Sequence, residues 1–174
     1  MKTVFAAVAF LAAAVVSPLV GQGDNEDSRL TLAGLRGVYV VVSDMKEDAR
    51  QKGLWEAQLR TDVELKLRQA GINVLTEEEV RRTPGLPYLY VTVSTLQLQA
   101  STLLGLYAFA VNVELVQTIC LGRSPSVLTL GRTWNPTGVF GTVGSDNLGE
   151  YVRKDVRDVT DQFINAYLAA NPKR

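Results

Sequence analysis

The chain contains no histidine, and this absence excludes more chemistry than any other feature of the composition. Serine or cysteine nucleophiles with a histidine base, histidine general acids and histidine metal ligands are all ruled out. A single cysteine also excludes an intrachain disulfide, a CxxC redox pair and a cysteine-based zinc site. The sequence therefore predicts no cofactor, no metal site and no catalytic residue, which favours a protein that is not an enzyme.

An excess of charge of either sign is also lacking, because 18 Lys and Arg residues balance 18 Asp and Glu residues. Without clustered basic side chains the chain lacks the electrostatic footprint for phosphate contacts, so nucleic acid is not an expected partner. What the chain does have is 174 residues, 47% of them hydrophobic, which is enough for one domain with a proper core.

The N-terminal segment has the layout of a secretory signal peptide. Lys2 precedes an apolar run from Val4 to Val16, and the helix breaker Pro18 and the small residues Gly21 and Gly23 follow. We expect residues 1–21 to be a signal peptide, cleaved after Gly21 or Gly23, and the protein to be secreted, with the periplasm as its compartment. The alternative is an uncleaved N-terminal helix that anchors a subunit of a membrane complex.

Hydrophobic periodicity predicts one domain at residues 37–174, after a polar linker at residues 22–36. Its first half reads β-α-β: a strand at 38–42, a helix that Asp44 and Glu47 cap and that ends at Ala70, and a short strand at 72–75. A second small cap at Thr76 and Glu79 and a turn at 83–87 follow.

The second half alternates apolar and polar residues, which predicts three antiparallel strands, at 89–94, 109–119 and 127–134, arranged as a meander. An apolar stripe from Leu148 to Ala170 predicts a long final helix that Asn171 and Pro172 stop. The predicted fold is α+β, with a mixed five-stranded sheet and two main helices packed on one face.

This arrangement resembles the small α/β domains of bacterial envelope proteins, such as auxiliary components of ABC-type transport systems and lipopolysaccharide-assembly lipoproteins. The stretches at 62–75, 133–134 and 163–172 are also similar to secreted bacterial envelope proteins without an assigned activity. The resemblance implies a role in the cell envelope and carries over no catalytic residue. The chain departs from the lipoproteins because no lipid-carrying cysteine follows its apolar N-terminal run.

Two positions next to helix starts or strand ends are candidates for ligand binding. Gly138, Gly141 and Gly144 precede a helix start, where free backbone amides can hold an anion, but the loop has no Lys and Asp146 already faces the helix dipole, so a turn is favoured. Asp44 follows a buried strand, where open α/β sheets often place ligands, although helix capping explains it as well.

Two side-chain features are also candidates. Asp155, Asp158 and Asp161 supply carboxylates on the last helix, but interleaved Arg and Lys residues favour a solvated helix face. Cys120 shares its strand parity with polar side chains, so its thiol is either a cross-linking group or, as favoured, a small buried hydrophobe.

Two apolar loops are predicted at one end of the sheet, where turn tips are ordinarily polar. Their hydrophobic residues are Leu103, Leu104 and Leu106 in the first loop, and Val139, Phe140 and Val143 in the second. We expect them to form a docking patch for a partner protein, a second copy or a membrane surface; the alternative is that each loop folds back over the core.

The sequence therefore predicts a secreted or periplasmic, non-enzymatic binding or assembly module of the bacterial cell envelope that acts through protein–protein contacts. The expected partner is an envelope protein or a second copy of the chain, and a peripheral membrane contact is a further option. Besides the membrane-anchored subunit, a small-ligand-binding protein or an enzyme without histidine chemistry stays open as an alternative.

Overall fold

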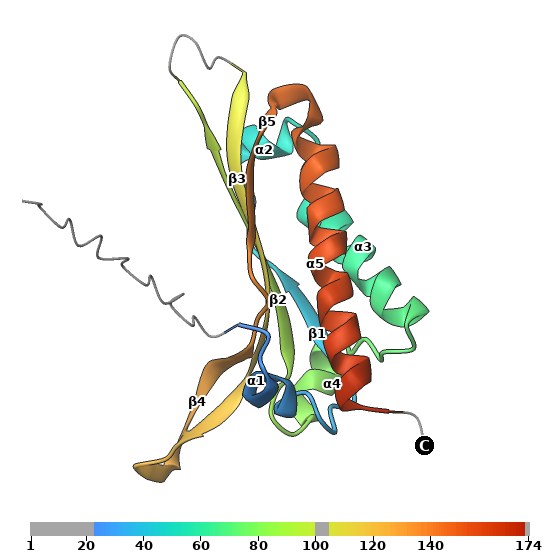
Figure 1. Cartoon of the computed structure of the whole chain (residues 1–174), viewed down its shortest axis with the longest axis vertical. Helices are drawn as coiled ribbons and strands as arrows, with labels where there is room; N and C mark the ends of the chain where they lie inside the picture. Colours follow the sequence, from blue (N-terminus) through green and yellow to red (C-terminus); the bar gives the residue numbers. More distant parts are fainter. Residues whose placement is uncertain (1–22, 100–104, 173–174) are drawn as a thin grey trace, which may run out of the picture.

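Five strands form one mixed sheet whose long helices, α3 and α5, lie against the same face (Figure 1). The computed structural model describes residues 23–99 and 105–172. In chain order the elements are α1 (Glu26–Leu30), β1 (Tyr39–Val42), α2 (Glu47–Arg50), α3 (Glu56–Gln69), α4 (Glu77–Arg82), β2 (Tyr88–Gln97), β3 (Leu106–Leu121), β4 (Ser124–Trp134), β5 (Val139–Gly144), a 3-10 turn at Ser145–Asn147 and α5 (Leu148–Ala170). The predicted α+β class, with a mixed five-stranded sheet, is confirmed.

The long strand β3 organises the sheet. It pairs antiparallel with β2 along one edge, and along the other edge with β5 at residues 106–111 and with β4 at residues 115–121. The edge strand β1 pairs with β2 in parallel. The pairing of β3 with β2 stops at Val116, so the β3–β4 hairpin beyond this point extends away from the rest of the sheet (Figure 1).

Strand alternation separates a core face from an open face. Odd-numbered residues of β3, such as Val111 and Val113, are fully buried, because α3 and α5 cover that side. At the base of the hairpin, the Trp134 ring packs edge-on against Phe163 of α5, with 5.3 Å between ring centroids. The opposite face has no helix over it in the described ranges (Figure 1).

The sheet has five strands, as expected, but one expected strand is absent and an unexpected segment takes its place. Residues 72–75 were expected to form a strand, yet only Val74 makes an isolated bridge, to Val38. The segment is too short to extend this pairing, because Thr76 begins the capping box of α4 immediately afterwards. The fifth strand is instead β5, in a segment that was expected to be a loop.

The expected helix from Asp44 to Ala70 is divided. Gly53 adopts a left-handed conformation with φ of 83° and separates α2 from α3, and the N-cap residues are Lys46 and Trp55, not Asp44. Asp44 is exposed and caps no helix by its side chain. The end of α3 is as predicted, because Gly71 has a φ of 78° and donates its N–H to Arg68.

The expected linker at residues 22–36 is wrong for its described part, because residues 23–36 pack against the domain. Leu32 is fully buried, and the Asp24 carboxylate accepts a hydrogen bond of 2.9 Å from the Trp134 indole. Asn171, at the end of α5, donates its side-chain amide to the Leu32 carbonyl and accepts from the Gly34 N–H. This segment is therefore part of the fold.

The long C-terminal helix, the small cap and the meander are confirmed. The helix α5 runs from Leu148 to Ala170, as its apolar stripe predicted. The side chains of Thr76 and Glu79 form the predicted reciprocal capping box. Strands β2, β3 and β4 form the predicted antiparallel meander.

Candidate functional site

The sheet surface opposite α3 and α5 is the best candidate for a functional site, and we call it the open face. It is made by the alternate side chains that point away from the core. These are Tyr39, Val41, Tyr88, Tyr90, Thr92, Ser94, Leu96, Ala108, Ala110, Asn112, Glu114, Val116, Thr118, Cys120, Leu128, Leu130, Arg132, Phe140 and Thr142.

A shallow groove of about 450 Å³ crosses the open face. Its lining is largely apolar and comes from four strands: Val41, Tyr88, Tyr90, Glu114, Val116 and Leu130. The neighbouring rings of Tyr39 and Tyr88 meet edge to face, with centroids 6.0 Å apart, which fixes the aromatic end of the groove. A partly exposed surface of tyrosines and aliphatic side chains suits a partner that buries apolar area.

Charge is nearly absent from this part of the molecule. Between Tyr88 and Ser145 the sequence carries only Glu114, Arg123 and Arg132 as charged residues. Glu114 and Arg132 both lie on the open face and pair with each other, with 3.0 Å between guanidinium nitrogen and carboxylate oxygen. The groove therefore offers no unpaired charge to a ligand, and recognition there depends on shape and apolar contact.

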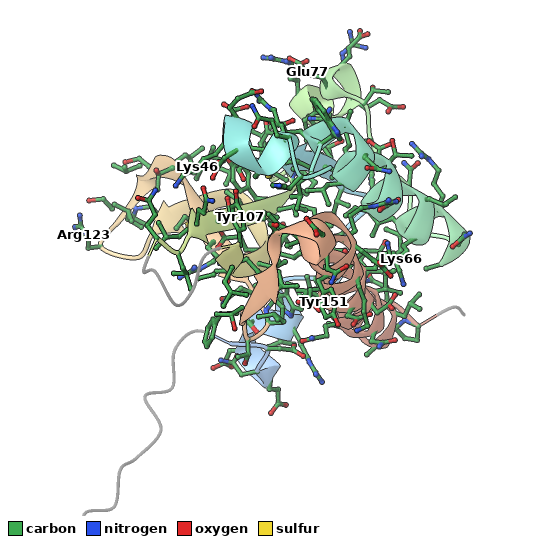
Figure 2. The ribbon with its side chains drawn as sticks, turned by 90° about the horizontal axis from the view of Figure 1, so that it is seen from above. Lys46, Lys66, Glu77, Tyr107, Arg123 and Tyr151 are labelled. Atoms are coloured by element: carbon green, nitrogen blue, oxygen red, sulfur yellow. The ribbon has the colours of Figure 1, made fainter. Side chains whose placement is uncertain are left out.

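The β3–β4 hairpin carries two exposed leucines. Leu128 is 67% and Leu130 is 54% exposed, and both lie on the open face. Cys120 pairs with Leu128 across the two strands and is exposed, which contradicts the favoured view of a buried hydrophobe. Figure 2 shows Arg123 at the outer end of this hairpin.

Only part of the predicted docking patch lies within the described residues. Leu103 and Leu104 lie outside the described residues, and Leu106 is half-buried at the start of β3. The other segment is not a loop. Its residues form β5, which pairs with β3 from Leu106 to Val111.

Within β5 the three predicted residues face different ways. Val143 is 8% exposed and belongs to the core, and Val139 is half-buried against it. Phe140, at 80% exposed, lies on the open face opposite Ala110. Phe140 is thus the member of this group that stands free on a surface, and that surface is the open face rather than a loop tip.

The remaining candidates serve the structure. Gly141 lies within β5 against the Phe109 ring, so the three glycines do not make one loop. On α5, Asp158 pairs with Lys154 and Asp161 pairs with Lys66 of α3, as expected for a solvated helix face. Burial raises the pKa of the Asp155 carboxyl, with no second carboxylate bonded to it.

A second cavity, of about 480 Å³, lies between α1 and the end of α5. Its carboxylate, Asp24, accepts hydrogen bonds of 2.6 Å from Arg29, which hold the pKa of this group below its usual range. Asp24 is therefore occupied in holding α1 on the domain. In the described ranges, no group of three His, Cys, Asp or Glu residues is placed to hold a metal ion.

Sequence reasoning missed the open face, although a signal for it was present. The run from Tyr88 to Val113 contains no charged residue, while the helices carry most of the charged residues. A half-exposed antiparallel sheet ordinarily places charged side chains on its solvated face. Among the described residues of this meander, the outward face carries only the charged pair Glu114 and Arg132, and such a sparsely charged face favours contact with a partner.

Comparison with solved structures gives distant likenesses in fold, among them two bacterial lipoproteins. No family model matches the chain, and no curated protein matches it. A solved structure of rare lipoprotein B from Shewanella oneidensis is similar with a TM-score of 0.38 and 13% identity, over 76% of this chain and 94% of that one. A minor lipoprotein from Acinetobacter baumannii is similar with a TM-score of 0.37 and 11% identity, over 79% and 93%. Likenesses at this level carry no argument about ligand, partner or location.

Among the described helices, none has the length and apolar composition that crossing a membrane requires.

Proposed function

We propose that the protein is a non-enzymatic binding module of the bacterial cell envelope that docks onto a partner protein through its open face. The observation that carries the proposal is the uncovered, nearly uncharged face of the meander, with its groove lined by tyrosine and aliphatic side chains. Exposed apolar surface of this kind is unfavourable in water and marks sites of association. The apolar N-terminal run supports an extracytoplasmic location.

The pairing of Glu114 with Arg132 supports a protein partner of neutral surface. Because the ion pair satisfies both groups within the chain, docking against an apolar surface leaves neither charge without a partner. The face also carries uncharged polar side chains, Asn112, Ser94 and Thr142, and protein interfaces combine apolar and polar area in this way.

Site-specific photo-cross-linking in native envelopes tests this proposal. A photoreactive phenylalanine analogue is placed at Tyr90 on the open face, and the matched control places it at Leu65, an exposed side chain on the outer side of α3. We expect the Tyr90 position to capture one defined envelope protein and the Leu65 position to capture none. Equal labelling from both positions, or none from Tyr90, would contradict docking through the open face.

Introducing a charge on the same surface provides an independent check. Phe140→Asp places a carboxylate at an 80% exposed position of the open face without disturbing the core. It is expected to abolish the Tyr90 cross-link while leaving the thermal unfolding temperature nearly unchanged. If the cross-link survives the substitution, Phe140 is not part of the docking surface.

The groove volume favours one other candidate function, the binding of a small apolar ligand. A cavity of about 450 Å³ lies within the range of pockets that hold small molecules, roughly 300–1,000 Å³. This candidate predicts that the purified protein carries a small molecule detectable by native mass spectrometry, and that Val116→Asp removes it.

A further inference from the structure

Between Leu128 and Gly131 the outer edge of β4 has no charged residue, no proline and no register shift. This stretch offers backbone groups for pairing, although the side chains of Leu128 and Leu130 also belong to the open face proposed above as a docking surface. Within residues 23–99 and 105–172, β4 pairs with β3 along one side and with no strand along the other. From Ser124 to Gly131 the strand contains no charged residue. Natural edge strands are ordinarily protected by charges, proline, bulges or covering elements, because unpaired backbone groups invite another strand. Pro125 and the register shift next to Leu128 protect the turn end of β4, but the stretch from Leu128 to Gly131 has none of these features.

The backbone geometry shows which groups of β4 point outward. The Thr118 N–H of β3 donates to the Gly85 carbonyl, at 2.7 Å, and therefore points away from β4. Thr118 lies opposite Leu130, so this is a pair without mutual hydrogen bonds, and the N–H and C=O of Leu130 point to the free edge. Because backbone direction alternates along a strand, the N–H and C=O of Leu128 also point to the free edge. The N–H and C=O of Thr129 point to β3, where Thr129 pairs with Ile119.

The same two residues expose their side chains. Leu128 and Leu130 are 67% and 54% exposed, so this short stretch presents free donors, free acceptors and apolar side chains together. The α1 segment approaches β4 only at its base, where Thr31 lies 3.4 Å from the Thr133 carbonyl oxygen. The outer part of the hairpin is left clear, in agreement with its position at the periphery of the molecule (Figures 1 and 2).

We propose that β4 pairs antiparallel with β4 of a second copy of this chain, about a two-fold axis through Thr129. In this register Leu128 lies opposite Leu130 of the other copy, and the outward backbone groups of both residues exchange hydrogen bonds. Two leucine pairs are then covered side by side on the open face. The two sheets join into one continuous sheet, the usual arrangement of strand addition.

Charge and symmetry select a second copy as the occupant. In antiparallel self-pairing about Thr129 the Arg132 residues of the two copies lie on opposite sides of the two-fold axis, six positions apart along the strands, so no like charges meet. Arg132 is also held by Glu114 of its own chain. Around Thr129 the two-fold pairing is self-complementary, since the outward N–H and C=O groups of Leu128 meet those of Leu130 in the other copy.

Disulfide trapping tests the register. In a Cys120→Ser background, Thr129→Cys places two thiols opposite each other, with Cα atoms about 4.5 Å apart, as in a pair without mutual hydrogen bonds, which is within disulfide range. The matched control, Val127→Cys, lies two residues away at a position that is also exposed, but its two copies are separated by about 14 Å in this register. The full chain is expressed for export, purified from the extracytoplasmic fraction and oxidised mildly.

We expect a covalent dimer from Thr129→Cys and none from Val127→Cys. Dimers from both variants would reflect random collision and would overturn the register, and a monomer from both would overturn the pairing itself. A cross-link from Thr129→Cys to a different envelope protein would overturn the second copy as occupant. None of these results bears on photo-cross-linking from Tyr90, so the two proposals fail separately.

Sedimentation of the protein without added cysteines supplies a second readout. Leu128→Lys is expected to weaken association by at least about tenfold, because a lysine on the edge is a common barrier to strand pairing. Leu96→Lys, a matched charge at the opposite end of the open face where the side chain is 59% exposed, is expected to leave association unchanged. Equal effects of the two lysines would contradict pairing at the β4 edge.

Discussion

Glu56 links α2, α3 and the loop after β1, and its replacement by glutamine provides a sharp test of how this region is held. Its carboxylate accepts hydrogen bonds from the Arg50 guanidinium at 2.6 Å and from the Met45 N–H at 2.7 Å. These contacts, with Arg50 the largest, hold the pKa of Glu56 at about 2, against an ordinary value of 4.5. The Glu56→Gln substitution keeps the shape of the side chain and removes the charge.

The magnitude follows from the shift. A lowering from 4.5 to about 2 corresponds to about 3 kcal/mol of preferential stabilisation of the charged form, at 1.36 kcal/mol per pKa unit. The side chains of Glu56 and Arg50 are 25% and 33% exposed, so solvent screening reduces the expected loss to about 1–2 kcal/mol at neutral pH.

The pH dependence has a definite sign. Because the pKa is lower in the folded state, the stabilisation is fully present above pH 4.5 and is lost as the pH falls toward 2. Urea unfolding followed by circular dichroism, at neutral pH and at several acidic values, measures the free energy of unfolding of both proteins. The difference between wild type and Glu56→Gln is expected to shrink steadily over this window.

Glu78→Gln is the matched control, because Glu78 pairs with Arg82 on the exposed surface of α4 and is 74% exposed. It removes the same charge and is expected to cost no more than about 0.5 kcal/mol. A Glu56→Gln protein as stable as wild type at neutral pH, or a difference that does not change between neutral pH and pH 2, would refute the reasoning.

Three further predictions concern packing and exposure. Gly149→Ala is expected to destabilise the protein by about 1–3 kcal/mol in urea unfolding, although alanine ordinarily stabilises a helix, because a Cβ there would lie 2.9 Å from the Lys52 carbonyl oxygen. Trp134→Phe removes the indole bond to Asp24 and leaves a cavity, with an expected loss of about 1–3 kcal/mol by the same assay; a neutral result would contradict the role of Trp134 in holding α1. The exposed Cys120 thiol is expected to react with a disulfide reagent in the native protein within roughly tenfold of the rate of a free peptide thiol, and protection until unfolding would show that it is covered.

Sequence reasoning recovered the elements whose signals are local. The apolar stripe of α5 continues for six turns and is followed by Asn171 and Pro172, so both the face and the end of the helix could be read directly. The meander strands have clear alternation, which fixed their orientation toward the core. The left-handed residue Gly71 marked the end of α3.

The misses have non-local causes. The β5 segment contains Gly141 and Gly144, which weaken any strand signal, and it is held as a strand by its pairing with the first six residues of β3. Residues 72–75 have strand-forming side chains but only one bridge to pair with. Polar composition made residues 23–36 look like a linker, whereas their partners, Trp134 and Asn171, lie more than 100 residues further along the chain.

For the candidate site, sequence identified apolar residues that need an explanation but placed them on loop tips. In the structure the candidate surface is a whole sheet face, since Phe140, Tyr90 and Leu130 lie on it together. Alternation alone indicates that a strand has two faces, not which of them a helix covers. Which face a helix covers depends on tertiary packing. The lack of charged residues between Tyr88 and Val113 was the feature of the sequence that indicated an uncovered apolar face.

The packing of residues 23–36 also sets an order of events in folding. This segment leaves the ribosome early, yet the groups that hold it, Trp134, Tyr167 and Asn171, belong to β4 and α5, which are made last. Closing contacts across 137 residues carries a loop-closure cost that local helices and hairpins do not. Residues 23–36 can therefore pack only after the C-terminal elements have been made. In a nascent chain that lacks α5, Leu32 and Leu35 have no surface to pack against.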